Sequence, residues 1–315
     1  VVTTSGAVVE AGPGATGTEL MANAEIAQHA ALEARRPGSW RHYDPAMRAE
    51  LARVAERRAG LDRALADGEF TLLYQPIVRL ADRSLAAFES LIRWPRPDGT
   101  LVLPDEFIGL AEATGQIIPL GRWILRTATA RAAAWNRDCA AAGCPPVRVT
   151  VNVSAHELRA PSVPGDVAAA LDAAGLDPDL LILEATESSL INQADQAREN
   201  LQAVRDQGVR LALDDFGTGY SSLRYLRDLP VTSLKIDRGF TAEVGVDDRQ
   251  TALMAGIVDL GHALGLGIVV EGIETEAQCG LVRGMGVTLG QGWLFGRPMT
   301  GEEAGELVRR AGSGA

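Results

Sequence analysis

The sequence predicts an α/β protein whose main domain is a TIM-like (β/α)8 barrel with an antiparallel first strand. Strand-like and helix-like segments alternate along most of the chain, and eight strands over roughly 245 residues match the size of such a barrel. Polar residues also appear where successive strands end. The short segment RLADR joins the first two strands in place of a helix, so this pair is expected to be antiparallel.

Length and composition restrict the class of protein. The 315 residues are 46% hydrophobic and 23% charged, which is typical of a packed globular protein. A net charge of −11 argues against a basic surface for long nucleic acid. Three cysteines without a CxxC pair, no apolar run of about 18 residues and no signal peptide predict a cytoplasmic protein. Any membrane tether would lie in sequence outside this chain.

The chain is expected to have three parts: a short α+β segment over 1–43, a connecting helix over 44–67 and the barrel over 68–315. The first segment combines a strand (VVTTSGAVV), an alanine-rich helix from Thr18 to Ala34 and a short strand near SWRHY. It is too short to bury a core of its own. Apolar residues at three- and four-residue steps give the helix over 44–67 one apolar stripe. That stripe fits a helix packed on the next domain, or a coiled helix that links domains.

The barrel strands are expected at 70–78, 84–94, 148–154, 181–188, 209–215, 233–237, 267–273 and 287–293. Helices are expected between most of them, including 120–142, 190–207, 248–264 and 300–310.

The stretch LALDDFGTGYSSLRYL gives the first indication of chemistry. Its buried strand stops at two adjacent carboxylates, Asp214 and Asp215, and a glycine turn follows over 216–222. Two adjacent carboxylates repel each other unless a cation lies between them, which favours a divalent metal. The simpler interpretation is a strand end with solvated acids before a turn.

Polar side chains recur at the ends of seven predicted strands. They are Glu89, Asn152, Glu184, Asp214, Asp215, Lys235, Glu271 and Gln291. In a barrel these strand ends meet on one face, where catalytic groups gather. Carboxylate and amide oxygens are the ligands that Mg²⁺ and Mn²⁺ prefer. So many acids in one rim favour a two-metal site.

Several of these side chains also have an ordinary structural interpretation. Glu89 could pair with Arg93, Asn152 could cap a turn, Lys235 could pair with Asp237, and Glu271 and Glu274 could begin a helix. Their recurrence at successive strand ends favours the site over eight separate coincidences.

Seven motifs in order carry a family resemblance: FESLIRW, VNVSAHEL, LEATES, DDFGTGYSSL, LKIDRGF, VVEGIETEAQ and GQGWLFGRP. Together with YQPIV at 74–78, they resemble the EAL-domain family of cyclic di-GMP phosphodiesterases over roughly residues 60–310. The signature Glu-Ala-Leu is here Glu89-Ser90-Leu91. Strand alternation places Ser90 on the side opposite Glu89, so the departure is expected to matter little.

The resemblance implies roles for individual residues. One metal would be held by Glu89, Asn152, Glu184 and Asp214, and a second by Asp214, Asp215 and Glu271. Lys235 would orient or deprotonate the attacking water, and Gln291 would support that water or a metal-bound one. Gln75, Leu91 and Arg93 would lie near the guanine and phosphate of the substrate. Glu187 would hold the glycine turn over the site.

The activity that this resemblance implies is hydrolysis of cyclic di-GMP to linear 5′-pGpG with two Mg²⁺ or Mn²⁺ ions. Ca²⁺ is expected to inhibit because its longer bonds suit such a pair poorly. The alternative is a catalytically silent cyclic di-GMP receptor that signals to a protein partner. The retained ligand positions favour the enzyme.

Residues 1–43 resemble the C-terminal end of a GGDEF (diguanylate cyclase) domain. The GGDEF motif itself is not in the sequence, so no cyclase activity is expected. The family resemblance further implies a homodimer, and N-terminal regulatory domains that this chain does not contain.

Overall fold

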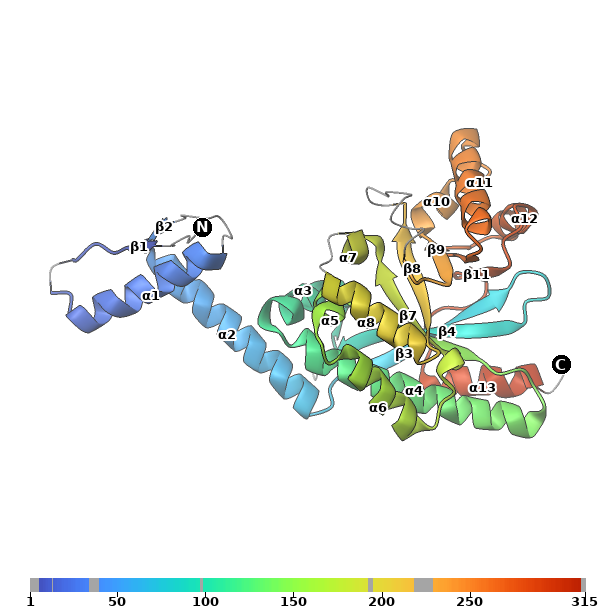
Figure 1. Cartoon of the computed structure of the whole chain (residues 1–315), viewed down its shortest axis with the longest axis horizontal. Helices are drawn as coiled ribbons and strands as arrows, with labels where there is room; N and C mark the ends of the chain where they lie inside the picture. Colours follow the sequence, from blue (N-terminus) through green and yellow to red (C-terminus); the bar gives the residue numbers. More distant parts are fainter. Residues whose placement is uncertain are drawn as a thin grey trace. The chain divides into compact units, whose positions relative to one another are not determined.

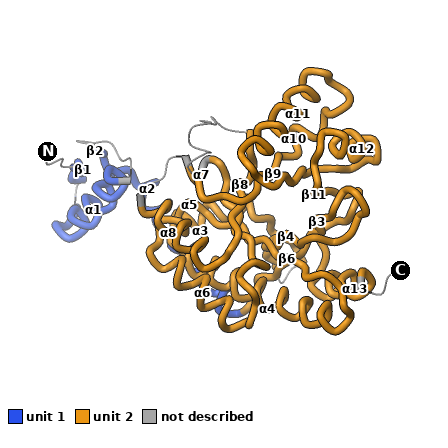
Figure 2. The backbone as a smooth tube through the Cα atoms, turned by 45° about the vertical axis from the view of Figure 1, so that its right-hand side comes forward, with its two compact units in different colours: residues 1–67 blue, residues 68–315 orange. Residues whose placement is uncertain are grey.

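The computed structural model of the chain describes residues 6–12, 14–33, 40–96, 99–191, 195–217 and 229–312. The chain divides into two compact units, residues 1–67 and 68–315 (Figure 2). The first unit is a small βαβ arrangement followed by a helix. Strands β1 (Gly6–Val8) and β2 (Trp40–His42) are parallel, and helix α1 (Gly17–Glu33) contacts both.

Helix α2 (Pro45–Ala66) completes the first unit. It begins where the sequence provides two start signals, since the side chain of Asp44 accepts a hydrogen bond from the Ala46 amide and Pro45 occupies the first turn. Arg48 donates to Asn23 across 2.7 Å, which links α2 to α1. The similarity of this unit to the end of a GGDEF domain stays a prediction, as do the boundaries of the three parts.

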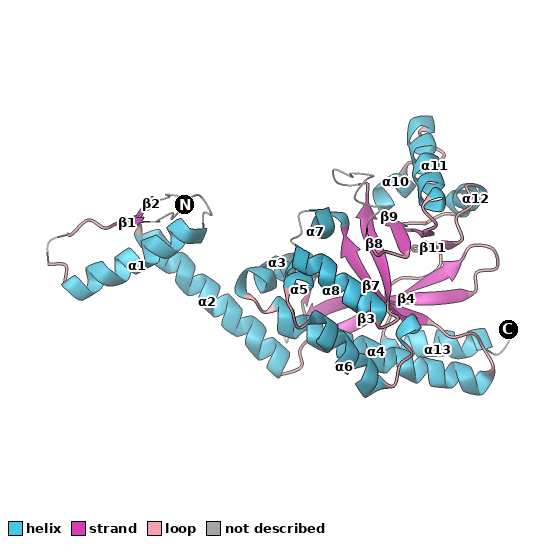
Figure 3. Ribbon diagram, viewed as in Figure 1, coloured by secondary structure: helices cyan, strands magenta, loops and turns pink. Residues whose placement is uncertain are grey.

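The second unit is a closed barrel of eight strands with helices around it (Figures 1 and 3). Its strands are β3 (Thr71–Arg79), β4 (Leu85–Pro95), β6 (Arg148–Asn152), β7 (Leu181–Thr186), β8 (Arg210–Phe216), β9 (Ser233–Ile236), β10 (Gly267–Val270) and β11 (Leu289–Gln291). They follow one another as β4-β6-β7-β8-β9-β10-β11-β3, and pairing of β3 with β4 closes the barrel.

Strand β3 is antiparallel to both of its neighbours, β4 and β11, whereas the other barrel strands pair in parallel. The predicted barrel with an antiparallel first strand is therefore confirmed. The physical reason is the short connection after Arg79, because a few residues can join antiparallel strands but not parallel ones. A further short strand, β5 (Leu101–Val102), pairs with β4 outside the barrel.

The helical segments of this unit are α3 (Pro104–Thr114), α4 (Ile117–Ala142), α5 (Ala155–Arg159), α6 (Val163–Ala174), η1 (Pro178–Leu180), α7 (Glu187–Ile191), α8 (Asp195–Asp206), α10 (Arg238–Ala242), α11 (Asp248–Ala263), α12 (Glu276–Gly284) and α13 (Gly301–Gly312). Within the helical stretch expected over 190–207, the structure describes α7 up to Ile191 and α8 from Asp195, and residues 192–194 lie outside the described residues. Among the described residues no helix is long and apolar enough to cross a bilayer.

Aromatic side chains fill the space between β3, β4 and the helices outside them. Trp135 of α4 packs with ring centroids 4.8 Å from both Tyr74 and Phe88. Nearer the carboxyl end of β4, Phe70 and Trp94 pack against Phe107 of α3 at centroid distances of 5.6 and 5.7 Å. Rings of this size bury large apolar areas. They fix α3 and α4 against the strand that carries Glu89.

Candidate active site

Inward-facing side chains of the barrel converge on one lysine. Lys235, the only lysine in the sequence, lies on β9 with 1% of its side chain exposed. Its Nζ is 2.6 Å from Glu271 Oε1 and 2.8 Å from Glu184 Oε2, and it also lies 3.3 Å from Asp214 Oδ1 and 3.6 Å from Glu89 Oε1. These carboxylates come from four different strands or strand ends. The structure therefore unites five of the predicted site residues.

Burial and charge oppose each other within this cluster. Burial alone would lower the pKa of Lys235, but Glu184, Glu89, Glu271 and Asp214 raise it well above its ordinary value. Burial raises the pKa of Glu184 well above its ordinary value and that of Glu271 to about 7. The raised pKa of Lys235 favours its ammonium form, and the raised pKa values of Glu184 and Glu271 reflect the cost of collecting several buried carboxylates around that one ammonium.

Glu89 has more polar partners than the other acids. Asn152 Nδ2 donates to its Oε1 across 3.0 Å, and Gln291 Nε2 donates to its Oε2 across 2.6 Å. Although burial acts in the opposite direction, the charge of Lys235 and these hydrogen bonds lower the pKa of Glu89. Among the described residues Arg93 makes no ion pair with Glu89 within 4 Å; its guanidinium donates to the Ile92 carbonyl, and the charge of Glu89 partly offsets the lowering of the Arg93 pKa by burial.

Two glutamine side chains on neighbouring strands continue the hydrogen bonds of Glu89, Gln291 on β11 and Gln75 on β3. Gln291 Nε2 also donates to Gln75 Oε1 across 3.0 Å, and Gln75 Nε2 donates to the Gly296 carbonyl across 3.1 Å. Gln291 Oε1 is buried and has no hydrogen-bond partner among the described residues. An unpaired buried carbonyl oxygen can accept a hydrogen bond from a ligand or a water that enters the site.

Asp215 reaches this region through an irregular backbone. In a regular strand, adjacent side chains point to opposite faces, so Asp214 and Asp215 could not both face the barrel interior. The register of β8 against β9 shifts between Leu213 and Phe216, and Asp215 has a φ of 54°. Such a bulge redirects a side chain, and aspartate tolerates this conformation better than most residues. Burial and the charge of Asp214 raise the pKa of Asp215.

The acidic cluster fits a divalent cation. Glu89, Glu184 and Asp214 each offer one carboxylate oxygen, and these three oxygens lie within 4.8 Å of one another. Three buried hard oxygen donors are a suitable first set of ligands for Mg²⁺ or Mn²⁺. Asn152 lies beside them on the solvent side, with its side chain directed toward Glu89. The unpaired oxygen of Gln291 adds a further acceptor close by.

Glu187 stands apart from the lysine cluster. It begins α7, is 4% exposed, and accepts a hydrogen bond from the Gly217 amide across 3.3 Å. The contact expected between this acid and the glycine turn is therefore present at Gly217. The rest of the turn, including Gly219 and the serines at 221 and 222, lies outside the described residues.

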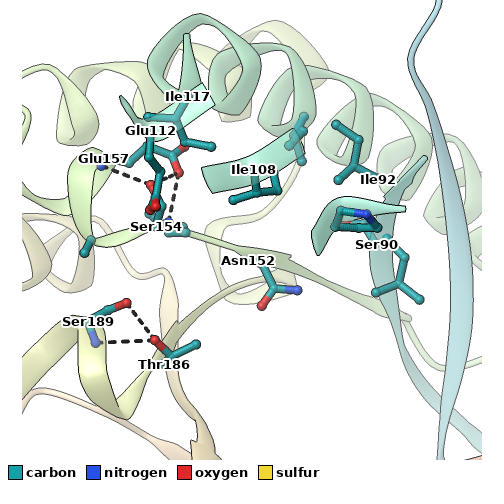
Figure 4. A pocket seen from close by; sticks show the side chains of 15 residues that line it. Ser90, Ile92, Ile108, Glu112, Ile117, Asn152, Ser154, Glu157, Thr186 and Ser189 are labelled. Atoms are coloured by element: carbon teal, nitrogen blue, oxygen red, sulfur yellow. Dashed lines mark hydrogen bonds between the residues drawn. The ribbon is translucent and has the colours of Figure 1, made fainter. Parts of the chain in front are cut away.

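A cavity of about 540 Å³ is lined by Asn152, whose side chain donates to Glu89 (Figure 4). It lies between the outer side of β4 and β6 and the helices α3, α4 and α5. Leu91 and Asn152 are among the residues that line it, and the side chains of Glu112 and Glu157 lie together in its wall. Ile92, Ile108 and Ile117 contribute apolar wall.

The sequence analysis did not identify Glu112 and Glu157. The S-x-x-E pattern at Ser154–Glu157 does signal a capping box, and the structure contains it, with Glu157 Oε2 accepting from Ser154 Oγ across 2.7 Å. Only the fold places Gly121 of α4 against this acid, where an added Cβ would lie 1.7 Å from Glu157 Oε1. Burial raises the pKa of Glu157 to about 7.

Ser90 lies on the side opposite Glu89, as strand alternation predicts. Its hydroxyl donates to the Thr150 carbonyl across 2.5 Å, and its side chain faces the cavity outside the barrel. Two other ordinary interpretations do not hold. Asp237 pairs with the Gly239 amide rather than with Lys235, and the helix after Glu271 begins only at Glu276.

An acidic, lysine-centred site at the carboxyl ends of the strands of a TIM-like barrel is typical of a hydrolytic enzyme with oxygen-ligated metals. The family to which the chain belongs is the EAL domain, whose model matches residues 58–298.

Two curated relatives come from Pseudomonas aeruginosa. The bifunctional diguanylate cyclase/cyclic di-GMP phosphodiesterase MucR is 38% identical over 93% of this chain and 42% of its own length. The cyclic di-GMP phosphodiesterase NbdA is 38% identical over 92% of this chain and 36% of its own length. This chain thus spans well under half the length of these relatives. The solved c-di-GMP complex of PaMucR phosphodiesterase has a TM-score of 0.74 and 39% identity over 79% of this chain and 99% of that one.

Proposed function

We propose that this chain hydrolyses cyclic di-GMP to linear 5′-pGpG with the help of two divalent cations, Mg²⁺ or Mn²⁺. The observation that carries the proposal is the cluster of three carboxylate oxygens within 4.8 Å of one another beside a buried ammonium. A site that only held cyclic di-GMP through its bases and phosphates would gain nothing from so much buried, repelling charge. The similarity to MucR and NbdA, both called cyclic di-GMP phosphodiesterases, supports hydrolysis of cyclic di-GMP.

In the proposed enzyme, Glu89, Glu184 and Asp214 would hold one cation together with Asn152. Asp214, Asp215 and Glu271 would hold the second. When bound, such a pair of cations neutralises phosphate charge and acidifies water. The bulge in β8 explains how consecutive aspartates could both contribute.

Lys235 stabilises charge in this proposal. As long as the surrounding carboxylates are ionised, its raised pKa keeps it protonated at neutral pH. A protonated lysine cannot accept the proton of the attacking water. It can orient that water and stabilise the negative charge that develops on the phosphate oxygens.

The cavity that Asn152 lines is proposed to receive one guanine of the substrate. Asn152 lines it and also donates to Glu89, so this side chain connects a base lying there to the carboxylates. Gln291 offers an unpaired carbonyl oxygen to water or a substrate hydroxyl. Arg93, half-buried near the mouth of the barrel, offers a guanidinium fork suited to phosphate.

The direct test is incubation of the purified chain with cyclic di-GMP and either Mg²⁺, Mn²⁺, Ca²⁺ or EDTA, followed by chromatographic separation of the nucleotides. We expect 5′-pGpG with Mg²⁺ or Mn²⁺ and none with EDTA, and we expect Ca²⁺ to inhibit. Intact substrate with every metal, together with saturable binding, would support the receptor in place of the enzyme. Sedimentation of the same samples tests the predicted homodimer, and fractionation of cells tests the predicted cytoplasmic location.

A further inference from the structure

Two cysteines face each other at the end of helix α4. Cys139 lies in the last turn, and Gly143, with a φ of 70°, reverses the chain directly after Ala142. The Cys144 amide then donates to the Cys139 carbonyl across 3.0 Å. This is the closing hydrogen bond of a Schellman turn, which brings the side chains of its two end residues together.

The two thiols differ in exposure but interact with each other. Cys139 is buried at 2% exposure, whereas Cys144 is partly exposed. Burial, a hydrogen bond with the Cys144 thiol and the nearby Asp138 carboxylate raise the pKa of Cys139 to about 12. Cys144 is therefore the thiol that is accessible to solvent, and the thiol of Cys139 is buried next to it.

We propose that Cys139 and Cys144 form a reversible oxidation site, which small hydroperoxides convert to an intramolecular disulfide. The thiolate of Cys144 attacks one oxygen of hydrogen peroxide; the O–O bond breaks and hydroxide leaves, so that Cys144 becomes a sulfenic acid. The sulfur of Cys139 then attacks that of Cys144, the S–O bond breaks and water leaves. The two thiols supply the two electrons that reduce one peroxide to two waters.

The turn that would be crosslinked leads directly to a strand of the active site. Asn136, one turn before Cys139, holds both the amide and the carbonyl of Val147 at 2.8 Å. Strand β6 begins at the next residue and ends at Asn152. Because helix end, turn and strand start are joined, a disulfide there would restrain the segment that positions Asn152. The inference does not depend on the proposed phosphodiesterase activity.

The test is a count of free thiols in the folded, purified chain before and after hydrogen peroxide. The oxidised protein is denatured in the presence of N-ethylmaleimide, which labels free thiols, and its mass is measured by mass spectrometry. We expect the three labels of the reduced protein to fall to one, and peptide mapping to find the remaining label on Cys279. Dithiothreitol should restore all three labels.

Single variants separate this site from nonspecific oxidation. Cys144→Ser, a change at a partly exposed position, should abolish the internal disulfide, whereas the matched control Cys279→Ser should form it as the unaltered chain does. In Cys139→Ser the sulfenic acid of Cys144 should be trapped by dimedone. Should Cys139→Ser fold poorly, phenylarsine oxide, which bridges only neighbouring thiols, probes the unaltered reduced chain. Three free thiols after oxidation, or a disulfide that includes Cys279 or joins two chains, would overturn the proposal.

Discussion

Replacing Lys235 with methionine removes the ammonium at the centre of the site and keeps a side chain of similar length. The four carboxylates between 2.6 and 3.6 Å from Nζ then have no buried cation among them. Leaving buried charge unpaired costs about 3–5 kcal/mol, so we expect the free energy of unfolding in EDTA at pH 7.5 to fall by that amount. Cyclic di-GMP hydrolysis should fall by at least roughly 100-fold through lost charge stabilisation.

The stability that Lys235→Met loses should increase with pH. Without Lys235 the buried carboxylates of the folded protein have raised pKa values, so the folded state holds protons that the unfolded state releases. The deficit of the variant should therefore be small near pH 5, where the carboxyls are protonated, and grow toward pH 8. Saturating Mg²⁺ should recover part of it, because cation binding to the folded state replaces the missing charge.

Urea denaturation followed by circular dichroism measures each of these differences. The matched control is Arg83→Met, which removes a cation from an exposed pair with Glu276. Solvent and salt screen an exposed pair, so this control should unfold nearly as the unaltered chain does. If Lys235→Met and Arg83→Met lost the same stability at every pH, the carboxylates would not depend on Lys235 for their charge balance.

Three further substitutions test neighbouring features. Glu89→Ala should nearly abolish hydrolysis. Ser90→Ala loses one buried hydrogen bond worth about 1 kcal/mol and should change the rate only modestly. Equal loss of activity in the two variants would contradict the assignment of Glu89 and Ser90 to opposite faces of β4. Glu187→Gln should weaken the hydrogen bond from the Gly217 amide, and we expect lower turnover and a shifted Mg²⁺ dependence. Unaltered kinetics would show that this hydrogen bond has no part in the mechanism. Glu157→Gln keeps the capping box but removes a carboxyl whose pKa rises from 4.5 to about 7 on folding. As pH rises from 4.5 to 7, the free energy of unfolding of the unaltered chain should therefore fall by up to about 3 kcal/mol, and that of the variant should not show this fall. Parallel dependence of the two free energies of unfolding on pH would contradict this.

The sequence alone determined the order of the strands, the antiparallel start of the barrel and the candidates for the site. These features follow from local patterns: the two-residue period of strands, the short connection after Arg79 and polar residues where apolar runs stop. Because the parallel strands of a barrel end on one face, the predicted barrel topology placed these candidate residues in a single site. Shorter elements such as α3, α6 and α12 were not anticipated, since their brief helical patterns are weak beside those of α4 and α11.

Only the tertiary structure decided which residues of the site contact one another. Gln75 and Gln291 are 216 positions apart and share a hydrogen bond, because closure of the barrel brings the first and last strands together. The bulge at Asp215 depends on the register of β8 against β9 and leaves no mark in the residue pattern. Likewise, only the packing of α4 on α5 places Gly121 against Glu157. Such contacts join segments distant in the chain, and local periodicity carries no information about them.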